Sequence, residues 1–434
     1  MREMKESGVT WVGKIPAAWE MKTIKQLMIE RVEKNKELEV NTILSLSAKD
    51  GVTLYNSENH SGNKPREDLS DYKIVRENDI VVNSMNILSG SVGLSAYTGV
   101  VSPVYYIYYP RDDGNVEYFH YIFQCFEFQR SLRGLGNGIL IKETESGGLN
   151  TIRMRIPSQK LGAQEFPYCS RKEQDRIVAA LEASAKKVDA LMANQETQIE
   201  KLKAYKQSLI TEVVTKGLDP NVPMKDSGVE WIGLIPKHWN TIATKYLFRI
   251  ESGATPKSEN PEYFDGDIPW ITPADYKTEE VFVFGGRRNI SELGLKSCST
   301  TLIPKGSLIF SKRAPIGAVA INAEELCTNQ GCLSCIPKTE DIVKYYYYVM
   351  SVCTEQYNLL GSGTTFKEIS ATNFANFVLP NPSVSEQEEM VAYLDEKCSK
   401  VDRLIAIKNA KIDKLNKYKK SLIYEYVTGK KEVM

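Results

Sequence analysis

The sequence predicts an α+β chain in which two globular, β-rich domains alternate with two long α-helices. Two observations predict this fold. The chain repeats one plan twice, and the stretches at about 171–216 and 385–429 carry the apolar period of a helix. Because 434 residues exceed one ordinary hydrophobic core, separate domains are expected.

The clearest repeat is a tryptophan-containing segment that begins at Met4 and again at Met224. The first copy reads MKESGVTWVGKIPAAWEMKTIKQL and the second reads MKDSGVEWIGLIPKHWNTIATKYL, with half of the positions identical. Four of the five tryptophans of the chain lie in these two segments. Since tryptophan is rare, the agreement indicates a duplication.

The two predicted helices form the second repeat. Neither contains proline, and glycine appears only at their ends, as Gly217 and Gly429. Apolar residues return every three or four positions, which is typical of a coiled-coil pair. In the first helix they are Ile177, Leu181, Val188, Leu191, Ile199, Leu202, Leu209 and Val213, and in the second Met390, Leu394, Val401, Leu404, Ile412, Leu415 and Leu422.

One polar residue interrupts each apolar stripe near the middle of its helix, Gln195 in the first and Lys408 in the second. The two positions are equivalent in the repeat. In an antiparallel pair the midpoints cross, so these side chains could meet and fix the register. The alternative is that both side chains turn outward into water.

The globular parts, at about 20–165 and 240–383, show short β-rich runs between Gly, Asn and Pro, followed by helical patches. This order favours an α+β arrangement over regular βαβ units. A fainter repeat links GNGILIKE at Gly136 with GSGTTFKE at Gly361. The middle of each half has diverged, as suits two readers of different targets on one shared frame.

Composition limits the classes of protein that fit. Apolar residues make up 42% and charged residues 25% of the chain, and 55 basic residues balance 55 acidic ones. That balance argues against a non-specific nucleic-acid coat, which is basic overall. No stretch approaches the ~20 apolar residues of a membrane span. No secretory signal is visible, and the eight cysteines are scattered, which indicates a reducing, cytoplasmic setting.

Motifs of catalysis are missing or imperfect. Cys327, Cys332 and Cys335, with Cys353, match the spacing of an iron–sulfur site, but the first half has no counterpart and the segment reads as a half-buried strand. The run from Asn260 to Phe264 lacks the second proline of an adenine methyltransferase loop. We therefore expect neither a metal site nor catalytic residues in this chain.

The motifs together resemble the specificity subunit of type I restriction–modification systems over nearly the whole length. The resemblance rests on the two SGV-x-W-[IV]-G-x-IP-x-x-W starts and on the helices that open with Glu-Gln, at Glu173 and Glu386, and close in YK-x-SLI-x-E-x-VT. The SGATPKSENPEYFDGDIPWITPADY block from Ser252 and the GSGTTFKEIS block from Gly361 complete it.

The resemblance implies two target recognition domains, at 1–165 and 218–383, each followed by a spacer helix, at 166–217 and 384–434. The two helices would pair as an antiparallel coiled coil. Each recognition domain would read one half of a bipartite, asymmetric site from the major groove of double-stranded DNA. The helices would set the spacer and dock two methyltransferase subunits, which a translocating endonuclease subunit can join. S-adenosylmethionine, ATP and Mg are then expected on the partner subunits and no cofactor on this chain.

DNA reading needs hydrogen-bonding side chains on loops. In the second domain the candidates are Lys312 and Arg313, which follow a predicted strand at a predicted turn, and Thr364, Thr365, Lys367, Arg287 and Arg288. In the first domain they are Asn83, Asn86, Tyr105, Asn137 and Lys142. For each one the alternative is a solvated loop residue. Ile139 and Leu140 stand in the first half where the second has two threonines, so the threonine contact does not transfer between the halves.

Two other functions compete with DNA reading. One is a non-catalytic scaffold whose twin domains bind protein partners, with the helices serving assembly. The other is an antagonist of a foreign restriction system that mimics DNA. The even charge balance speaks against the mimic, because such proteins are strongly acidic.

Overall fold

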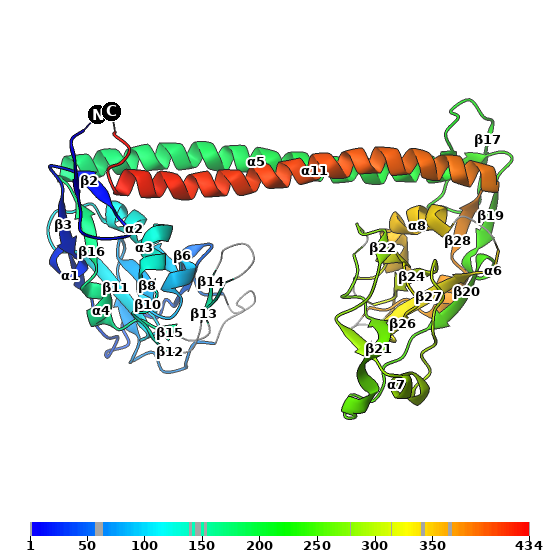
Figure 1. Ribbon diagram of the computed structural model, residues 1–434, viewed down its shortest axis with the longest axis horizontal. Helices are drawn as coiled ribbons and strands as arrows, with labels where there is room; N and C mark the ends of the chain where they lie inside the picture. Colours follow the sequence, from blue (N-terminus) through cyan, green and yellow to red (C-terminus); the bar gives the residue numbers. More distant parts are fainter. Residues whose placement is uncertain are drawn as a thin grey trace. The chain divides into compact units, whose positions relative to one another are not determined.

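The computed structural model describes residues 2–56, 64–138, 141–143, 149–151, 154–277, 279–313, 315–339, 343–362 and 367–433. The chain divides into two compact units (Figure 1): unit 1 comprises Met1–Gln195 with Asn409–Met434, and unit 2 comprises Glu196–Lys408. The division crosses both long helices, α5 (Arg171–Lys216) and α11 (Val384–Val427). Each unit therefore combines a globular part with a portion of each helix, and the four-segment division expected from the sequence stays a prediction.

Unit 1 is built on an antiparallel sheet in the order β4-β11-β8-β9. Its strands are β4 (Met28–Glu30), β11 (Tyr105–Pro110), β8 (Ile80–Asn83) and β9 (Val92–Leu94). The other antiparallel pairs are β1 (Met4–Glu6) with β2 (Lys14–Pro16), β3 (Glu20–Thr23) with β16 (Glu165–Tyr168), β5 (Leu44–Ser47) with β6 (Gly51–Leu54), β7 (Lys73–Val75) with β10 (Gly99–Val101), β12 (Asn137–Gly138) with β15 (Met154–Arg155), and β13 (Ile141–Glu143) with β14 (Leu149–Thr151). Short helices connect them: α1 (Ile24–Leu27), the 3-10 turn η1 (Ile87–Ser89), α2 (Val116–Gln124), α3 (Phe126–Ser131) and α4 (Ser158–Gly162).

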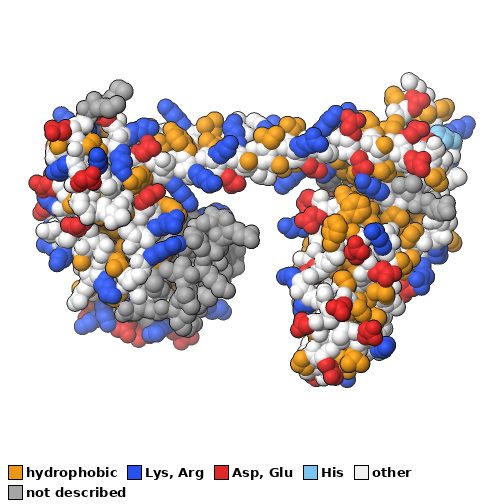
Figure 2. All heavy atoms as spheres, in the orientation of Figure 1, with side chains coloured by type: hydrophobic (Ala, Val, Ile, Leu, Met, Phe, Trp, Pro, Cys, Tyr) orange, Lys and Arg blue, Asp and Glu red, His pale blue; other side chains and the backbone are white. Residues whose placement is uncertain are grey.

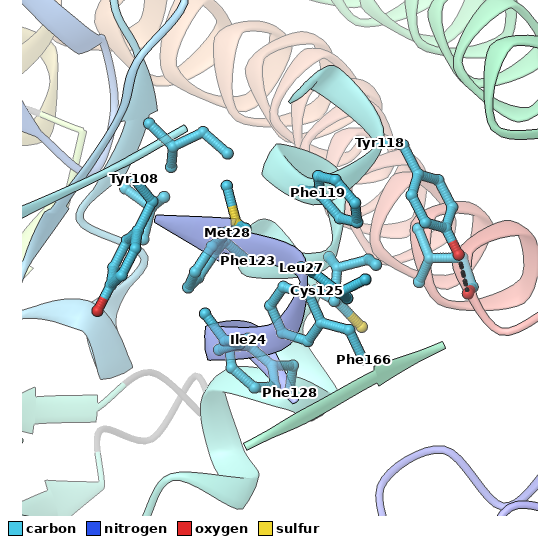
Figure 3. Close-up of a cluster of buried hydrophobic side chains, with 14 of the residues drawn as sticks. Ile24, Leu27, Met28, Tyr108, Tyr118, Phe119, Phe123, Cys125, Phe128 and Phe166 are labelled. Carbon is cyan, nitrogen blue, oxygen red and sulfur yellow. Dashed lines mark hydrogen bonds between the residues drawn. The ribbon is translucent and has the colours of Figure 1, made fainter. Parts of the chain in front are cut away.

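The core of unit 1 is aromatic. Phe123, Phe128 and Phe166 meet edge to face, with ring centroids 5.0 to 5.8 Å apart. Figure 3 shows them beside Ile24, which lies at the end of the first tryptophan repeat, and Met28, which directly follows that repeat. Edge-to-face pairs add about 0.5–1.5 kcal/mol each beyond the burial of their area. This cluster joins α2, α3 and β16 to the start of the unit.

Unit 2 is built on a five-stranded sheet in the order β20-β27-β24-β25-β22, antiparallel except for the β22–β25 pair. Its strands are β20 (Phe248–Ser252), β27 (Cys332–Pro337), β24 (Leu308–Ser311), β25 (Val319–Asn322) and β22 (Phe282–Val283). The remaining strands are β17 (Met224–Asp226) with β18 (Leu234–Pro236), β19 (Asn240–Ala243) with β28 (Val378–Asn381), and the sheet of β23 (Arg288–Ile290), β21 (Phe264–Ile271) and β26 (Cys327–Thr328). The helical elements are α6 (Thr244–Leu247), η2 (Pro261–Tyr263), α7 (Glu292–Ser297), α8 (Val343–Ser351), α9 (Thr354–Leu360) and α10 (Ala371–Ala375).

The duplication seen in the sequence is also a duplication of the fold. The order β4-β11-β8-β9 in unit 1 recurs as β20-β27-β24-β25 in unit 2. The hairpin formed by each tryptophan repeat keeps one register, because Met4 pairs with Pro16 and Met224 pairs with Pro236. The α+β prediction is confirmed, and unit 2 adds β22 and a separate three-stranded sheet to the shared frame.

Within each unit the two long helices run antiparallel, and an ion pair joins them. In unit 1, Asp189 accepts from Lys419 at 2.8 Å. In unit 2, Asp402 accepts from Lys206 at 2.7 Å. The two pairs occupy equivalent positions of the repeat, so the same contact fixes the same register twice. No helix within the described ranges has the combined length and apolarity that a bilayer crossing requires.

The helix seam differs from the expected stripe at one position in each helix. Leu191 and Leu404 belong to the apolar period, yet their exposed fractions are 46% and 47%. Gln195 is buried, and Lys408 donates a hydrogen bond to Gln198 within unit 2. The expected meeting of Gln195 with Lys408 would join the two units and stays a prediction.

A tryptophan–glutamate hydrogen bond ties each tryptophan repeat to the start of a long helix. In unit 1, the indole Nε1 of Trp19 donates to Glu173 at 3.1 Å. In unit 2, the indole Nε1 of Trp239 donates to Glu386 at 2.9 Å. Both indoles are fully buried, so each hydrogen bond satisfies a donor that would otherwise lack a partner. The duplicated Glu-Gln motif thus has a structural role at the helix start.

The same tryptophans also meet the other end of the helix pair. Gly217 follows α5 and Gly429 follows α11, each with a positive φ, of 77° and 69°. A Cβ at Gly217 would lie 3.2 Å from Trp239, and one at Gly429 would lie 3.0 Å from Trp19. Glycine is therefore required at both positions for conformation and for space. In each unit, one indole holds the beginning of one long helix and the end of the other.

The carboxylate of Glu386 is the titratable centre of this junction. Burial acts to raise its pKa, but hydrogen bonds from Ser383, Trp239 and His238 lower the pKa to about 2. Ser383 and Glu386 also form a reciprocal cap, since the backbone N–H of Ser383 donates to the Glu386 carboxylate at 3.1 Å and the Glu386 N–H to Ser383 Oγ at 3.4 Å. The folded state therefore favours the ionised form of Glu386.

We predict that Glu386→Gln lowers the free energy of unfolding at pH 7 by about 1–3 kcal/mol, the range for losing hydrogen bonds to a charged group. Because folding lowers this pKa, the contribution is complete above pH 4.5 and disappears as pH falls towards 2. Urea unfolding of both proteins at pH 7 and at pH 3 measures it. Exposed Glu388 supplies the matched control, Glu388→Gln. A difference that stays constant with pH would contradict this account.

Candidate functional site

The first cluster of candidate residues lies directly after β24, at the turn where the sequence predicted it. Lys312 Nζ lies 2.9 Å from Glu368 Oε1, and Arg313 Nε donates to Glu368 Oε2 at 2.7 Å. One carboxylate thus holds two cations. Burial acts to raise the pKa of Glu368, but the bonds from Lys312 and Arg313 outweigh it and lower the pKa. The cluster keeps a net positive charge.

Backbone hydrogen bonds fix this turn. The Lys312 N–H donates to Gly331 at 2.9 Å, and the Lys312 carbonyl accepts from Ile369 at 3.0 Å. The Ser311 hydroxyl donates to the Arg313 carbonyl oxygen at 2.8 Å. These hydrogen bonds hold the backbone that bears the two cations, which restricts where their side chains can reach.

The second cluster is built on a buried carboxylate. Asp275 Oδ2 accepts from the backbone and hydroxyl of Thr272 at 2.8 and 2.7 Å. Its Oδ1 accepts from the backbone and Nε of Arg287 at 3.2 and 2.8 Å. The Asp275 side chain is 4% exposed and that of Arg287 is 73% exposed. Burial acts to raise the pKa of Asp275, but these hydrogen bonds lower it, so the carboxylate is ionised.

The two clusters are neighbours. Gly331, which accepts from Lys312, packs so closely on Pro273 that an added Cβ would lie 2.9 Å from its ring. Burial raises the pKa of the Cys332 thiol to about 12, and the charges of Asp275 and Lys312 both act on that thiol. We call Arg287, Lys312 and Arg313, with the anchors Asp275 and Glu368, the arginine surface of unit 2.

Three further candidates of the second domain have different environments. Arg288 is exposed and its guanidinium lies 4.0 Å from the centre of the Phe264 ring, a cation–π contact. Lys367 is exposed beside Glu368. Thr364 and Thr365 lie outside the described residues.

In unit 1 the structure brings three candidates to the end of β8, the strand equivalent to β24. Asn83 pairs with Tyr105 across β8 and β11. The Asn83 side chain is largely buried and accepts from the Met85 N–H at 3.0 Å, so it supports the turn. Asn86, three residues after Asn83, is exposed. Tyr105 is half-buried, and this burial raises its pKa. Asn137 lies in β12 and Lys142 in β13, and their side chains lie outside what the structure describes.

The anchors were missed by sequence reasoning. Asp275 had a local signal, since Thr272 stands three residues before it, which is the spacing at which a threonine and an acidic residue form a capping box. Glu368 had none, because its partner Arg313 is 55 residues away along the chain. The sequence predicts cationic residues as DNA ligands, but it does not predict the carboxylates that orient them.

The cysteine motif contains four buried thiols. Burial raises the pKa of Cys327 to about 11 and that of Cys332 to about 12, and it raises the pKa of Cys335 and of Cys353 beyond those values. Protonated thiols are poor metal ligands. In the described ranges no group of three or more His, Cys, Asp or Glu residues is arranged to hold a metal ion.

Parts of the chain are similar to known proteins. Residues 236–417 match the family model described as "Type I restriction modification DNA specificity domain". The MjaIX specificity subunit of Methanocaldococcus jannaschii is 39% identical over 166 residues, 38% of each chain. The MjaX specificity subunit, a putative one from the same organism, is 25% identical over 63% of this chain and 61% of its own length. The chain thus matches less than two thirds of the length of these curated relatives.

One solved structure shares the fold. It is a chain from a study of complex assembly and conformational transition of the type I R-M system. The TM-score is 0.67 at 14% identity, with 95% of this chain and 98% of that chain covered. The resemblance to type I specificity subunits found in the sequence is confirmed.

We predict that a maleimide at pH 8 labels Cys298 in the folded protein and leaves the other seven cysteines unlabelled, because Cys298 is the half-exposed thiol and the others are buried. Mass spectrometry of peptides, with and without denaturant, measures the labelling. Iron in the purified protein, or rapid labelling of Cys332 or Cys335, would contradict it.

Proposed function

We propose that the whole chain is the sequence-specific DNA-binding subunit of a type I restriction–modification complex, because residues 236–417 match the family model of type I restriction modification DNA specificity domains. The recognition domains are the globular parts, 1–165 and 218–383, and the spacer helices are 166–217 and 384–434. A subunit that acts on cellular DNA would work in the cytoplasm.

The arginine surface of unit 2 is the observation that carries this proposal. Arg and Lys side chains supply the charge that phosphates attract and the donors that guanine accepts. Lys312 and Arg313 stand at the end of β24, on a turn whose backbone is held by hydrogen bonds to Gly331 and Ile369. Such fixed donors suit recognition of one DNA sequence over others.

The corresponding turn in unit 1 offers different chemistry. In unit 1, Ser84 and Met85 directly follow β8, where unit 2 has Lys312 and Arg313 after β24. Asn86 comes next, and Tyr105 of β11 pairs with Asn83 at the end of β8. Asparagine pairs with adenine through two hydrogen bonds, whereas lysine and arginine contact phosphate or guanine. Two equivalent frames with unlike reading side chains support a bipartite site whose two halves differ in sequence.

We assign no catalytic step to this chain. Adenine methylation, DNA translocation and cleavage would belong to two methyltransferase subunits and an endonuclease subunit. S-adenosylmethionine, ATP and Mg would be bound by those partners.

The long helices offer a surface for two copies of one partner. Leu191 and Tyr418 in unit 1 are 46% and 50% exposed, and Leu404 and Tyr205 in unit 2 are 47% and 55% exposed. Leu191 and Leu404 are equivalent in the repeat, as are Tyr205 and Tyr418. Figure 2 shows apolar side chains at the surface of the long helices among basic and acidic ones. A single exposed leucine is ordinary, but an equivalent set in each unit favours two equal docking sites.

We predict that co-expression with the methyltransferase gene of the same system, in a host without adenine methylation, marks one bipartite and asymmetric DNA motif. Single-molecule sequencing detects the methylated adenines. Arg313→Ala should weaken binding of the complex to that site by about 1–3 kcal/mol, roughly 5- to 150-fold, measured by titration of a duplex. Unchanged binding would reject Arg313 as a DNA contact, and methylation without this chain would reject the proposed function.

We also predict that Leu191→Glu or Leu404→Glu each removes one methyltransferase copy and that the double variant removes both, because a charge in a docking surface is costly to bury. Native mass spectrometry of the co-expressed complex gives the stoichiometry. Leu293→Glu, at an exposed leucine of α7, is the control. Two bound copies on the double variant would exclude this surface.

A further inference from the structure

Arg287 and Arg31 are both held by an aspartate, but in different ways. Arg31 in unit 1 donates from Nε to Asp79 Oδ2 at 2.7 Å and from Nη2 to Asp79 Oδ1 at 3.1 Å, and its side chain is 15% exposed. Arg287 donates to Asp275 from Nε alone among its side-chain nitrogens. Within the described part of the chain, no protein acceptor is bonded to the two terminal nitrogens of Arg287. Arg31 therefore serves the fold, while Arg287 presents a fixed pair of donors to solvent.

Arg287 is held both by the Asp275 carboxylate and by the close packing of the backbone at Gly286. Asp275 is buried and its two oxygens already accept four hydrogen bonds, so its position is fixed. Gly286 precedes Arg287, and a Cβ there would lie 2.5 Å from the Trp270 carbonyl oxygen and 3.2 Å from Asp275 Oδ2. The backbone and the Nε of Arg287 are thus both held against one carboxylate. This removes much of the rotational freedom that an exposed arginine ordinarily has.

We propose that Arg287 reads a guanine in the half-site bound by unit 2, donating its two terminal nitrogens to the O6 and N7 of that base. The proposal rests on the proposed function and names the base and the residue. Guanine presents two acceptors on its major-groove edge, in the spacing of a guanidinium. Adenine places an amino donor where guanine has O6, so the fixed donors of Arg287 would reject it.

Charge favours a base over a phosphate as the acceptor. Asp275 is ionised and, among the residues that the structure describes, Arg287 is its cationic partner, so this pair has no net charge to attract a phosphate. Its directed donors remain suited to the uncharged edge of guanine. Glu368, in contrast, is shared by Lys312 and Arg313, and that cluster keeps a net positive charge suited to phosphate. The arginine surface thus contains a reader and, beside it, a cationic clamp.

The test uses the complete complex of this chain with its methyltransferase subunits. Once the motif is known from sequencing, each guanine of both half-sites is replaced in turn by 7-deazaguanine, which lacks the N7 acceptor, and binding is measured by titration. For the unaltered complex we expect a loss of roughly 5- to 150-fold at one guanine. Arg287→Lys keeps the charge but loses the paired donors, so the penalty at that guanine should vanish while penalties at other positions stay.

Two variants complete the design. Asp275→Asn, checked for folding by thermal melting, should reduce the same penalty because the anchor is weakened. Arg249→Lys alters an exposed arginine of β20 paired with Glu251 and should leave every penalty unchanged. A motif without guanine, or identical penalties in the Arg287→Lys complex, would overturn the assignment. Absence of any sequence-specific binding by the unaltered complex would overturn the proposed function itself.

Discussion

The hydrogen bond between a buried tryptophan and the first-turn glutamate of a long helix is the contact on which the architecture depends. Trp19 makes it with Glu173, and Trp239 makes it with Glu386. Each indole also closes on the glycine that ends the other helix. A helix end exposes backbone groups that need partners, and a buried indole needs an acceptor. One cluster of a tryptophan, a glutamate and a glycine supplies both sets of partners, and the chain contains this cluster twice.

Because the frame is duplicated, its structural contacts are the same in both units, whereas the side chains that would contact DNA differ between them. The helix register is fixed by equivalent ion pairs, Asp189 with Lys419 and Asp402 with Lys206. Exposed pairs of this kind contribute little energy individually; their value here is to select one alignment of two similar stripes. The ion pairs of Lys312 and Arg313 with Glu368 after β24 are not repeated by the residues after β8, so unlike side chains can follow equivalent strands of the frame.

Buried or half-buried carboxylates fix the positions of the cationic side chains on the candidate DNA surface. A cation alone is a mobile charge, whereas Arg287 on Asp275 is a donor pair in a set direction. Burying the Asp275 carboxylate is tolerable because four hydrogen bonds compensate its lost hydration. Glu368 performs a related task for two cations at once. The anchors thus determine which chemistry each arginine can present.

The sequence by itself determined the duplication, the two long helices and their ends, and the turn after β24 that bears Lys312 and Arg313. These features depend on local period, on glycine and proline, and on comparison of one half with the other. Only the tertiary structure decided that Glu368 holds Arg313, 55 residues away, and that Leu191 and Leu404 face solvent. Contacts between distant segments arise from packing of the whole unit, and no local period encodes which side chain meets which.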